Sequence, residues 1–527
     1  MKNGATSIIM YFGLLCELVG KNKASEVQRH MLDYVIKETQ KFLENMPKSE
    51  RKKKGQFFTS LETAEYMASL FVLKQKDVIS VLDPGAGTGI LAAAFIERIQ
   101  TENISEKIIL TCYETDEQVL PILESNLRYI KDNSKIVIEY HVIQDDYLLS
   151  QANDFEDNLL ANPAPPKYDY IIGNPPYLRV MKDDAAALAM PRVVHGAPNL
   201  YFLFASMSLF NLKPDCEMVY IIPRSWTSGL YFKTFRKYFL NYGKLEHIHL
   251  FVSRDKVFSQ EQVLQETIII KVKKTTTPPD KVILSSSQSN GDFNSITEIE
   301  LPYNAVVVGD EWYVFLPTNE EEIKTIQSIN RYTKTLPEIG IRMKTGIIVD
   351  FRQWDDLRKT EEKGTVPLFY SQHIKNGRVN HLPSGKEFDW VIDEKAGLIQ
   401  ENKDYVFCKR FTAKEERRRL QCGIYLASDF PQYEKIGTQN KINFVERTDK
   451  KKLTINEIYG LYALLNSTLF DMYYRILNGS TQVNSTEINN IPVPPLSDID
   501  EIGKRLIQAD DLSTNTCDTI LSEVSYG

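Results

Sequence analysis

The side chains best suited to chemistry in this sequence follow a short apolar run, as Asn174-Pro175-Pro176-Tyr177. Residues 170–173 predict a buried strand that leads straight into them. Each proline has a fixed φ and keeps the residue before it out of the α region, so Asn174 is expected on a stiff, extended turn. Its amide can accept and donate hydrogen bonds, and Tyr177 offers an aromatic face. An acceptor, a proline carbonyl and a ring could hold a planar exocyclic amine, although a simple Pro-Pro strand terminator is the alternative.

A second candidate is the glycine-rich loop Asp83-Pro84-Gly85-Ala86-Gly87-Thr88-Gly89. It follows a buried-type strand over residues 78–82 and opens a helix over 90–99. Alternate glycines allow a tight turn and a close approach of the backbone to a ligand. The spacing differs from the dinucleotide pattern G-x-G-x-x-G. An acidic residue at the strand end would repel a pyrophosphate but suits the amino group of an amino-acid moiety.

Acidic side chains also follow the next two predicted strands, residues 108–113 and 136–143. Glu114 stands where a ribose diol is held in doubly wound nucleotide sites. Asp146 could accept a hydrogen bond from an adenine amine, and Tyr147 could cover the adenine ring. For the pair Asp145-Asp146, an ordinary turn is the alternative, because such pairs are common in turns.

Strands and helices alternate along the first half of the chain. Further strands are expected at 217–222, 245–251 and 267–272. The last two should be antiparallel, because their connection, which holds Phe258, has no helical pattern. Alternating elements followed by one antiparallel pair predict a three-layer α/β sandwich.

Composition narrows the class of protein. A chain of 527 residues should form two or three domains, and 43% hydrophobic with 25% charged residues is typical of a globular protein. The net charge of −7 requires any DNA-binding surface to be a local patch. The six cysteines include no CxxC, which argues against a metal site and fits a reducing cytoplasm. The apolar run 8–16 is interrupted by Glu17 and is too short to cross a bilayer, so a packed helix is favoured over a signal and no membrane partner is expected.

Taken in order, the segment Gly55-Gln56-Phe57-Phe58-Thr59-Ser60, the glycine loop, the acidic residues after the strands and Asn-Pro-Pro-Tyr resemble one family. Residues 50–275 resemble the γ-class, TaqI-like DNA adenine-N6 methyltransferases of restriction-modification systems. The resemblance implies S-adenosyl-L-methionine (SAM) as cofactor. It also implies a class I SAM-dependent methyltransferase fold, which is a Rossmann-like sheet with an antiparallel last strand.

The resemblance assigns roles to individual residues. For SAM it implies contacts to the methionine end from Thr59, Asp83, Gly85 and Gly87, to the ribose from Glu114, and to the adenine from Asp146 and Tyr147. For the target it implies the catalytic motif Asn174, Pro175, Pro176 and Tyr177, with N6 held by the amide and the Pro175 carbonyl. Tyr177 and Phe258 would pack on the two faces of an adenine flipped out of duplex DNA.

The C-terminal half has a different composition, beginning with the Thr- and Pro-rich residues 275–279. We expect an N-terminal helical segment (1–50), a catalytic domain (51–330) that ends in a linker or excursion, a DNA target-recognition domain (331–495) and a helical tail (496–527) with a closing helix near 502–521. Residues 403–452 hold 13 basic and 7 acidic residues, opposite in sign to the whole chain. The candidate DNA contacts there are Lys409, Arg410, Arg417, Arg418 and Arg419, and a solvated helix is the alternative.

Other functions share parts of this pattern. An RNA adenine methyltransferase and a protein glutamine-amide methyltransferase are alternatives within the same chemistry. A non-enzymatic DNA-specificity subunit is an alternative of another class, although it would have no reason to keep a complete SAM pocket. The expected protein is a cytoplasmic monomer whose partner is double-stranded DNA, and the resemblance allows a separate cognate restriction endonuclease.

Overall fold

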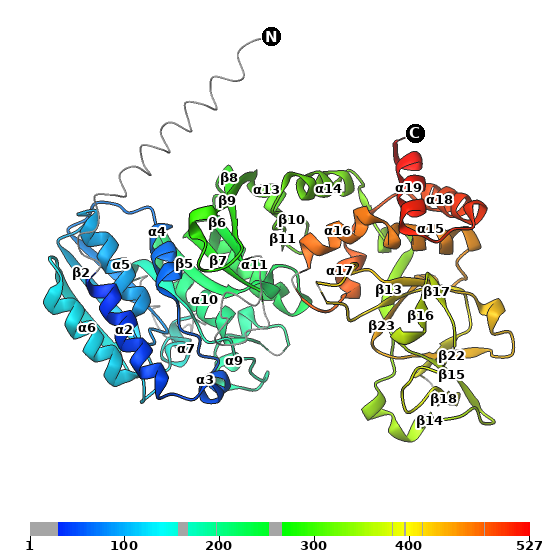
Figure 1. Cartoon of the computed structure of the whole chain (residues 1–527), viewed down its shortest axis with the longest axis horizontal. Helices are drawn as coiled ribbons and strands as arrows, with labels where there is room; N and C mark the ends of the chain where they lie inside the picture. Colours follow the sequence, from blue (N-terminus) through cyan, green and yellow to red (C-terminus); the bar gives the residue numbers. More distant parts are fainter. Residues whose placement is uncertain are drawn as a thin grey trace, which may run out of the picture. The chain divides into compact units, whose positions relative to one another are not determined.

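The computed structural model describes residues 30–155, 167–196, 198–251, 266–381, 383–394, 397–413, 415–478 and 480–526. They form two compact units (Figure 1). The first comprises the described residues of Met1–Pro223 and Lys237–Tyr303, and the second those of Arg224–Arg236 and Asn304–Gly527. The apolar run 8–16 and Phe258 lie outside the described residues.

The first unit is built on a nine-stranded sheet with the strand order β3-β2-β1-β4-β5-β7-β6-β8-β9. The strands are β1 (Val78–Asp83), β2 (Lys107–Tyr113), β3 (Val137–Ile143), β4 (Tyr168–Gly173), β5 (Leu212–Pro223), β6 (Gly243–Phe251), β7 (Thr267–Lys274), β8 (Lys281–Ser287) and β9 (Thr297–Pro302). Strands β3, β2, β1, β4 and β5 run parallel, and β7 lies antiparallel between β5 and β6. The predicted α/β methyltransferase fold with an antiparallel strand is therefore confirmed.

Strands β8 and β9 extend this sheet beyond the point where composition suggested a linker. β8 pairs in parallel with β6, and β9 pairs antiparallel with β8. The polar side chain of Ser285 in β8 is buried, and it bonds to His249 Nδ1 at 2.8 Å. Because the serines are satisfied inside the sheet, a Ser-rich stretch serves here as a strand rather than a linker.

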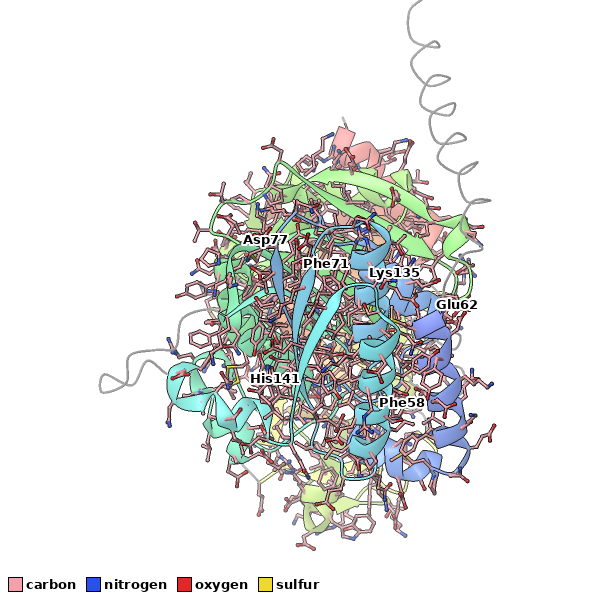
Figure 2. All side chains as sticks on the ribbon, turned by 90° about the vertical axis from the view of Figure 1, so that its left-hand side faces the viewer. Phe58, Glu62, Phe71, Asp77, Lys135 and His141 are labelled. Carbon is pink, nitrogen blue, oxygen red and sulfur yellow. The ribbon has the colours of Figure 1, made fainter. Side chains whose placement is uncertain are left out.

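Helices cover both faces of the sheet. The helices of this unit are α2 (His30–Glu44), α3 (Lys48–Lys54), α4 (Leu61–Ser69), α5 (Ile90–Thr101), α6 (Leu120–Asn133), α7 (Tyr147–Ser150), α8 (Ala152–Phe155), α9 (Ala185–Leu188) and α10 (Leu200–Asn211), and α11 (Lys233–Tyr242) crosses the boundary between units. Tyr170 and Ile172 of β4 pack into one apolar cluster with α2, α4, α5 and α6. Figure 2 views this unit from the side of β3, which carries His141.

The opposite face of the sheet lies against α10. Tyr220 of β5 points to this side, where its hydroxyl lies 2.5 Å from Ser208 Oγ of α10. A Cβ on Gly173, the last residue of β4, would lie only 2.9 Å from the Tyr220 ring. A side chain at Gly173 would therefore displace the ring directly before Asn174.

The second unit combines five longer helices with two sheets. Its helices are α13 (Tyr303–Val306), α14 (Glu320–Asn330), α15 (Ile455–Asn466), α16 (Thr468–Leu477), α17 (Ser485–Asn489), α18 (Leu496–Ala509) and α19 (Thr514–Tyr526), of which α13 begins at the boundary. One sheet holds β13 (Ile341–Thr345), β23 (Ile442–Arg447), β20 (Tyr405–Lys409), β21 (Cys422–Tyr425), β17 (Arg378–Val379) and β16 (Ile374–Lys375) in that order. The other holds β14 (Leu357–Arg358), β18 (Trp390–Ile392), β15 (Thr365–Phe369), β22 (Lys435–Thr438) and β19 (Ile399–Glu401). Two further pairs are β10 (Val307–Val308) with β11 (Tyr313–Val314), and β12 (Lys334–Thr335) with β24 (Pro492–Val493).

Two sequence predictions are corrected in this unit. The single closing helix predicted near 502–521 is a pair, α18 and α19, because Asp510 takes a left-handed φ of 47° and ends α18. The basic run after β20 is not a helix in its described residues, since Phe411 forms a β-bridge with Gln482. In the described part of the chain, no helix combines the length and the apolar character that crossing a membrane would require.

Candidate active site

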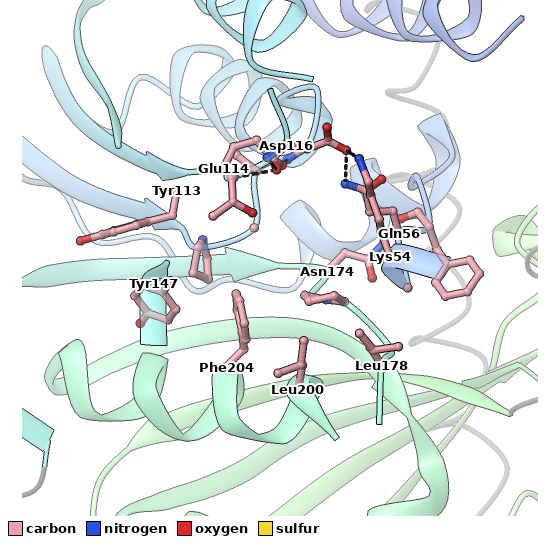
Figure 3. A pocket seen from close by; sticks show the side chains of 18 of the residues that line it. Lys54, Gln56, Tyr113, Glu114, Asp116, Tyr147, Asn174, Leu178, Leu200 and Phe204 are labelled. Atoms are coloured by element: carbon pink, nitrogen blue, oxygen red, sulfur yellow. Dashed lines mark hydrogen bonds and ion pairs between the residues drawn. The ribbon is translucent and has the colours of Figure 1, made fainter. Parts of the chain in front are cut away.

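A cavity of about 740 Å³ lies at the carboxyl ends of the parallel strands, where α/β sheets usually bind ligands (Figure 3). The loops after β1, β2, β3 and β4 all contribute to it. Its lining includes the predicted residues Thr59, Gly85, Gly87, Glu114, Asp146, Tyr147, Asn174 and Pro176. Leu200 and Phe204 of α10 form an apolar wall opposite Glu114 and Asp116. The structure thus brings eight predicted site residues together around one space.

Asn174 is held in one orientation by the segment before α4. Its Nδ2 donates to the carbonyl oxygen of Phe57 at 2.7 Å and to Thr59 Oγ1 at 3.1 Å. Because a carbonyl oxygen can only accept, the amide cannot be flipped without losing this bond. Asn174 Oδ1 is buried and has no hydrogen-bond partner among the described residues. An unsatisfied buried acceptor costs about 1–3 kcal/mol, so this oxygen is suited to receive an N–H donor from a ligand.

The same segment is tied to Tyr177 by its backbone. Gly55 has a φ of +66°, and its carbonyl accepts a hydrogen bond from the Tyr177 amide at 3.0 Å. A Cβ at Gly55 would lie 3.1 Å from the Tyr177 backbone, so this position suits glycine in both conformation and space. The Tyr177 hydroxyl donates to the carbonyl of Ile221 at 3.0 Å, and burial raises the pKa of Tyr177 well above its usual value.

Asp116 anchors the other end of this segment. Its Oδ2 accepts from Lys54 Nζ at 2.7 Å and from Gln56 Nε2 at 2.9 Å (Figure 3). Its Oδ1 accepts from the Gln118 amide at 3.1 Å. Sequence patterns did not single out Lys54 or Gln56 individually, and the contribution of Phe57 is a backbone carbonyl that no side-chain pattern could reveal.

Glu114 organises the glycine loop as well as facing the cavity. Its carboxylate accepts hydrogen bonds from the amides of Gly87 at 2.9 Å, Thr115 at 2.9 Å and Asp116 at 2.8 Å. Burial raises the pKa of Glu114, and these three amides act in the opposite direction. A carboxylate has about four acceptor positions, so Glu114 retains capacity for one hydroxyl donor of a ligand.

Asp83 lies beneath the glycine loop at the end of β1. The side chain is fully buried, and neither carboxylate oxygen has a hydrogen-bond partner among the described residues. Burial raises the pKa of Asp83 to about 8. Since an isolated buried charge is strongly unfavourable, this carboxyl is suited to ionise when a cationic group approaches.

At Asp146 and Tyr147 the sequence allowed either an ordinary turn or a contact to an adenine, and the structure is compatible with both. Asp146 Oδ1 caps α7 by accepting from the amides of Leu148 and Leu149, both at 2.9 Å, so the turn interpretation describes one of its oxygens. Its other oxygen is free of that cap, and the residue is exposed at the cavity. The Tyr147 hydroxyl accepts from Asn211 Nδ2 at 3.0 Å, which fixes the ring that lines the cavity.

The predicted DNA contacts in the second unit do not all face solvent. Arg419 is completely buried and donates to Asn478 Oδ1 at 3.2 Å and to the Ser480 carbonyl at 2.8 Å. Arg418 donates to the Ser467 carbonyl at 3.0 Å. The prediction that Arg419 contacts DNA is therefore wrong, because a buried guanidinium cannot reach a phosphate, and Arg418 is largely committed to internal bonds. Lys409, Arg410 and Arg417 retain exposed surface.

The sequence is similar to known restriction-modification methyltransferases. A model of the Eco57I restriction-modification methylase family matches residues 98–258. Type II methyltransferase M.BsuBI of Bacillus subtilis is 35% identical over 462 residues, which are 86% of this chain and 90% of the relative. Type II methyltransferase M.PstI of Providencia stuartii is 34% identical over 468 residues, with the same two shares.

Two solved structures are also similar. The type IIL restriction-modification enzyme MmeI in complex with DNA is 13% identical, with a TM-score of 0.48 over 94% of this chain and 73% of that chain. A putative class I S-adenosylmethionine-dependent methyltransferase from Listeria monocytogenes is 17% identical, with a TM-score of 0.39 over 52% of this chain and 79% of that chain.

Proposed function

The chain belongs to the type II restriction-modification DNA methyltransferases, and we propose that it transfers a methyl group from SAM to N6 of an adenine in duplex DNA. The observation that carries the proposal of an exocyclic amine as target is Asn174, whose buried Oδ1 is unpaired while its Nδ2 is fixed by Phe57 and Thr59. An unpaired acceptor on a residue that lines the cavity, next to a proline carbonyl, matches the two protons of an exocyclic amine. Membership of this family supports DNA as substrate over RNA or a glutamine side chain.

The donor set around the cavity fits SAM. The unpaired carboxyl of Asp83 suits the cationic methionine end, the remaining acceptor position of Glu114 suits a ribose hydroxyl, and the uncapped oxygen of Asp146 suits the adenine amine. The apolar wall of Leu200 and Phe204 suits the ring. When bound, SAM supplies an electrophilic methyl group. The cavity of about 740 Å³ lies within the size range of ligand sites.

The protein's own contribution to the reaction is chiefly positioning. The lone pair of an adenine amine is delocalised into the ring, which makes N6 a poor nucleophile. Asn174 Oδ1 and the Pro175 carbonyl would accept the two amine protons and favour a tetrahedral nitrogen whose lone pair points at the methyl group. Holding the two reactants in line in this way supplies much of the rate.

Access to N6 requires the adenine to leave the double helix. Tyr177 follows Asn174 in the same turn, its hydroxyl donates to the Ile221 carbonyl and its ring packs 5.2 Å from that of Phe57, so the ring is held in place before any base arrives. We assign to it the stacking of the extruded adenine, with Phe258 as the partner on the other face.

Nucleoside analysis by mass spectrometry tests this function. Duplex DNA of mixed sequence is incubated with the protein and SAM, digested and separated. N6-methyldeoxyadenosine is expected as the product, and Asn174→Ala should give none while still binding SAM in calorimetry. Formation of N4-methylcytosine instead would overturn the adenine assignment, and methylation by Asn174→Ala at the wild-type rate would remove this amide from the mechanism.

A further inference from the structure

Two loops of the second unit expose large apolar side chains next to basic ones. Ile347 is 39% exposed, Phe351 77% and Phe411 44%. Side chains of this size seldom stand exposed in a group without a partner that covers them. We call the surface formed by residues 346–353, 410–412, 439–441 and 481–483 the aromatic-basic face.

Backbone hydrogen bonds join these loops into one surface. The Asn440 amide donates to the Ile348 carbonyl at 2.8 Å, and the Arg410 amide donates to the Lys441 carbonyl at 2.9 Å. The Val483 amide donates to the Arg410 carbonyl at 2.7 Å. Each loop is therefore held at its edge by the next, and the exposed side chains stand on a fixed backbone.

Two guanidinium groups stand over aromatic rings on this face. The Arg352 guanidinium lies 5.6 Å from the centre of the Phe351 ring, and that of Arg410 lies 5.7 Å from the Phe411 ring. Arg410 is also fixed by hydrogen bonds to the Asn440 carbonyl at 3.0 Å and to Gln482 Oε1 at 3.4 Å. Such pairs place cations and flat apolar surfaces side by side.

The charge of the face identifies the kind of partner. Its segments hold three basic residues, Arg352, Arg410 and Lys441, and one acidic residue, Asp350, whereas the whole chain has a net charge of −7. A locally positive surface on an acidic protein suits a polyanion. Exposed rings and the amides of Asn440 and Gln482 add groups that can contact bases.

We propose that the aromatic-basic face binds the duplex DNA substrate, with Arg352 and Lys441 at phosphates and Phe411 against bases. This inference rests on the proposed function, because it assumes that the substrate is duplex DNA. It also replaces the internal Arg418 and Arg419 as the centre of DNA contact in this unit. Within Lys409–Arg419, Phe411 is exposed beside Arg410, whereas Thr412 and Arg419 are buried.

The test is DNA binding by the full-length protein, measured by fluorescence anisotropy with labelled duplex DNA at several salt concentrations. Arg352→Gln and Lys441→Gln should each lower the slope of log affinity against log salt by about 0.9, the value for one lost phosphate contact. Phe411→Ala should weaken binding about tenfold with a smaller change in slope, since a lost base contact is largely independent of salt. The matched controls are Lys504→Gln and Ile507→Ala, exposed residues of α18 in the same unit, which should bind as wild type does.

The possible failures are distinguishable. If the three face variants bind DNA with wild-type affinity and slope while the wild-type protein methylates DNA, the face is refuted and the proposed function stands. If the wild-type protein neither binds nor methylates DNA, the proposed function itself fails. If the variants instead lose self-association in sedimentation and keep DNA affinity, the face belongs to a second copy of the chain, which overturns the proposal. Thermal unfolding at the wild-type midpoint confirms that each substitution leaves the fold intact.

Discussion

Thr59 offers the sharpest test of how the amide of Asn174, the proposed catalytic group, is held. The family resemblance assigns Thr59 to the methionine end of SAM, whereas the structure shows its Oγ1 3.1 Å from Asn174 Nδ2. Thr59→Val keeps the shape of the side chain and removes the hydroxyl, so one of the two acceptors that orient the amide is lost. The Phe57 carbonyl, at 2.7 Å, remains.

The size of the effect follows from that geometry. Thr59 is buried, so water cannot readily replace the lost acceptor. Loss of a buried hydrogen bond costs about 0.5–1.5 kcal/mol net, and more where a donor is left unsatisfied. If this cost falls on the productive orientation of Asn174, kcat should decrease by about tenfold, since each 1.36 kcal/mol of barrier is one factor of ten. SAM affinity should stay within about twofold of wild type.

The assay is single-turnover methylation at saturating SAM and DNA, combined with calorimetric titration of SAM. Thr59→Ser retains the hydroxyl and is the matched control, with a rate expected close to wild type. A defect of Thr59→Val that appears in SAM affinity, with the single-turnover rate unchanged, would refute the positioning role and restore the cofactor role that the resemblance implies.

Three further outcomes are expected at the same site. Glu114→Ala should weaken SAM binding by roughly 1–3 kcal/mol in calorimetry, because it removes a charged acceptor and also frees the Gly87 amide; unchanged affinity would exclude Glu114 from the cofactor site. The pKa of Asp83 is raised to about 8, so the folded protein without ligand favours the protonated carboxyl. The contribution of this group to the free energy of unfolding is therefore present at low pH and is lost as pH rises through 8. A cationic ligand must displace that proton, so SAM affinity should increase between pH 6 and 8 by a factor that approaches ten per pH unit. Asp83→Asn should abolish this pH dependence of SAM affinity. An equal pH dependence in the wild type and in Asp83→Asn would contradict a contact between Asp83 and SAM. Tyr177→Phe loses the bond to the Ile221 carbonyl but keeps the ring, and should retain most activity. Tyr177→Ala should reduce the fluorescence increase of 2-aminopurine at the target position, which reports base flipping; Tyr177→Phe as inactive as Asn174→Ala would give the hydroxyl a chemical role.

Strands β1 to β7 could be predicted because a sheet covered on both faces needs nearly continuous apolar strands. The apolar runs that end at Asp83, Glu114 and Asn174 all became parallel strands whose loops meet at one cavity. The ends of those strands could also be predicted, because glycine and proline are favoured in turns and disfavoured within strands.

Other elements were hidden because their side chains are polar and yet buried. Ser285 in β8 is satisfied by His249, so a strand with a polar sequence lies inside the sheet. Arg419 shows the same effect in the second unit, where Asn478 and Ser480 accept hydrogen bonds from a buried guanidinium that charge counting placed on the surface. A count of charged residues does not show whether a given side chain is exposed, because a charged side chain can be buried where hydrogen-bond partners surround it.

The segment from Lys54 to Thr59 connects the two halves of the site by contacts distant in sequence. At one end Lys54 and Gln56 bond to Asp116, beside the expected ribose contact, and at the other end Phe57 and Thr59 bond to Asn174. Each such bond contributes only about 0.5–1.5 kcal/mol, so none of them alone could fix the segment against its own conformational freedom. Together they act on one short stretch of backbone, which means that the loss of a bond at one end loosens the other. The orientation of Asn174, the proposed amine acceptor, is therefore set by the same six residues that line the cavity from Lys54 to Thr59.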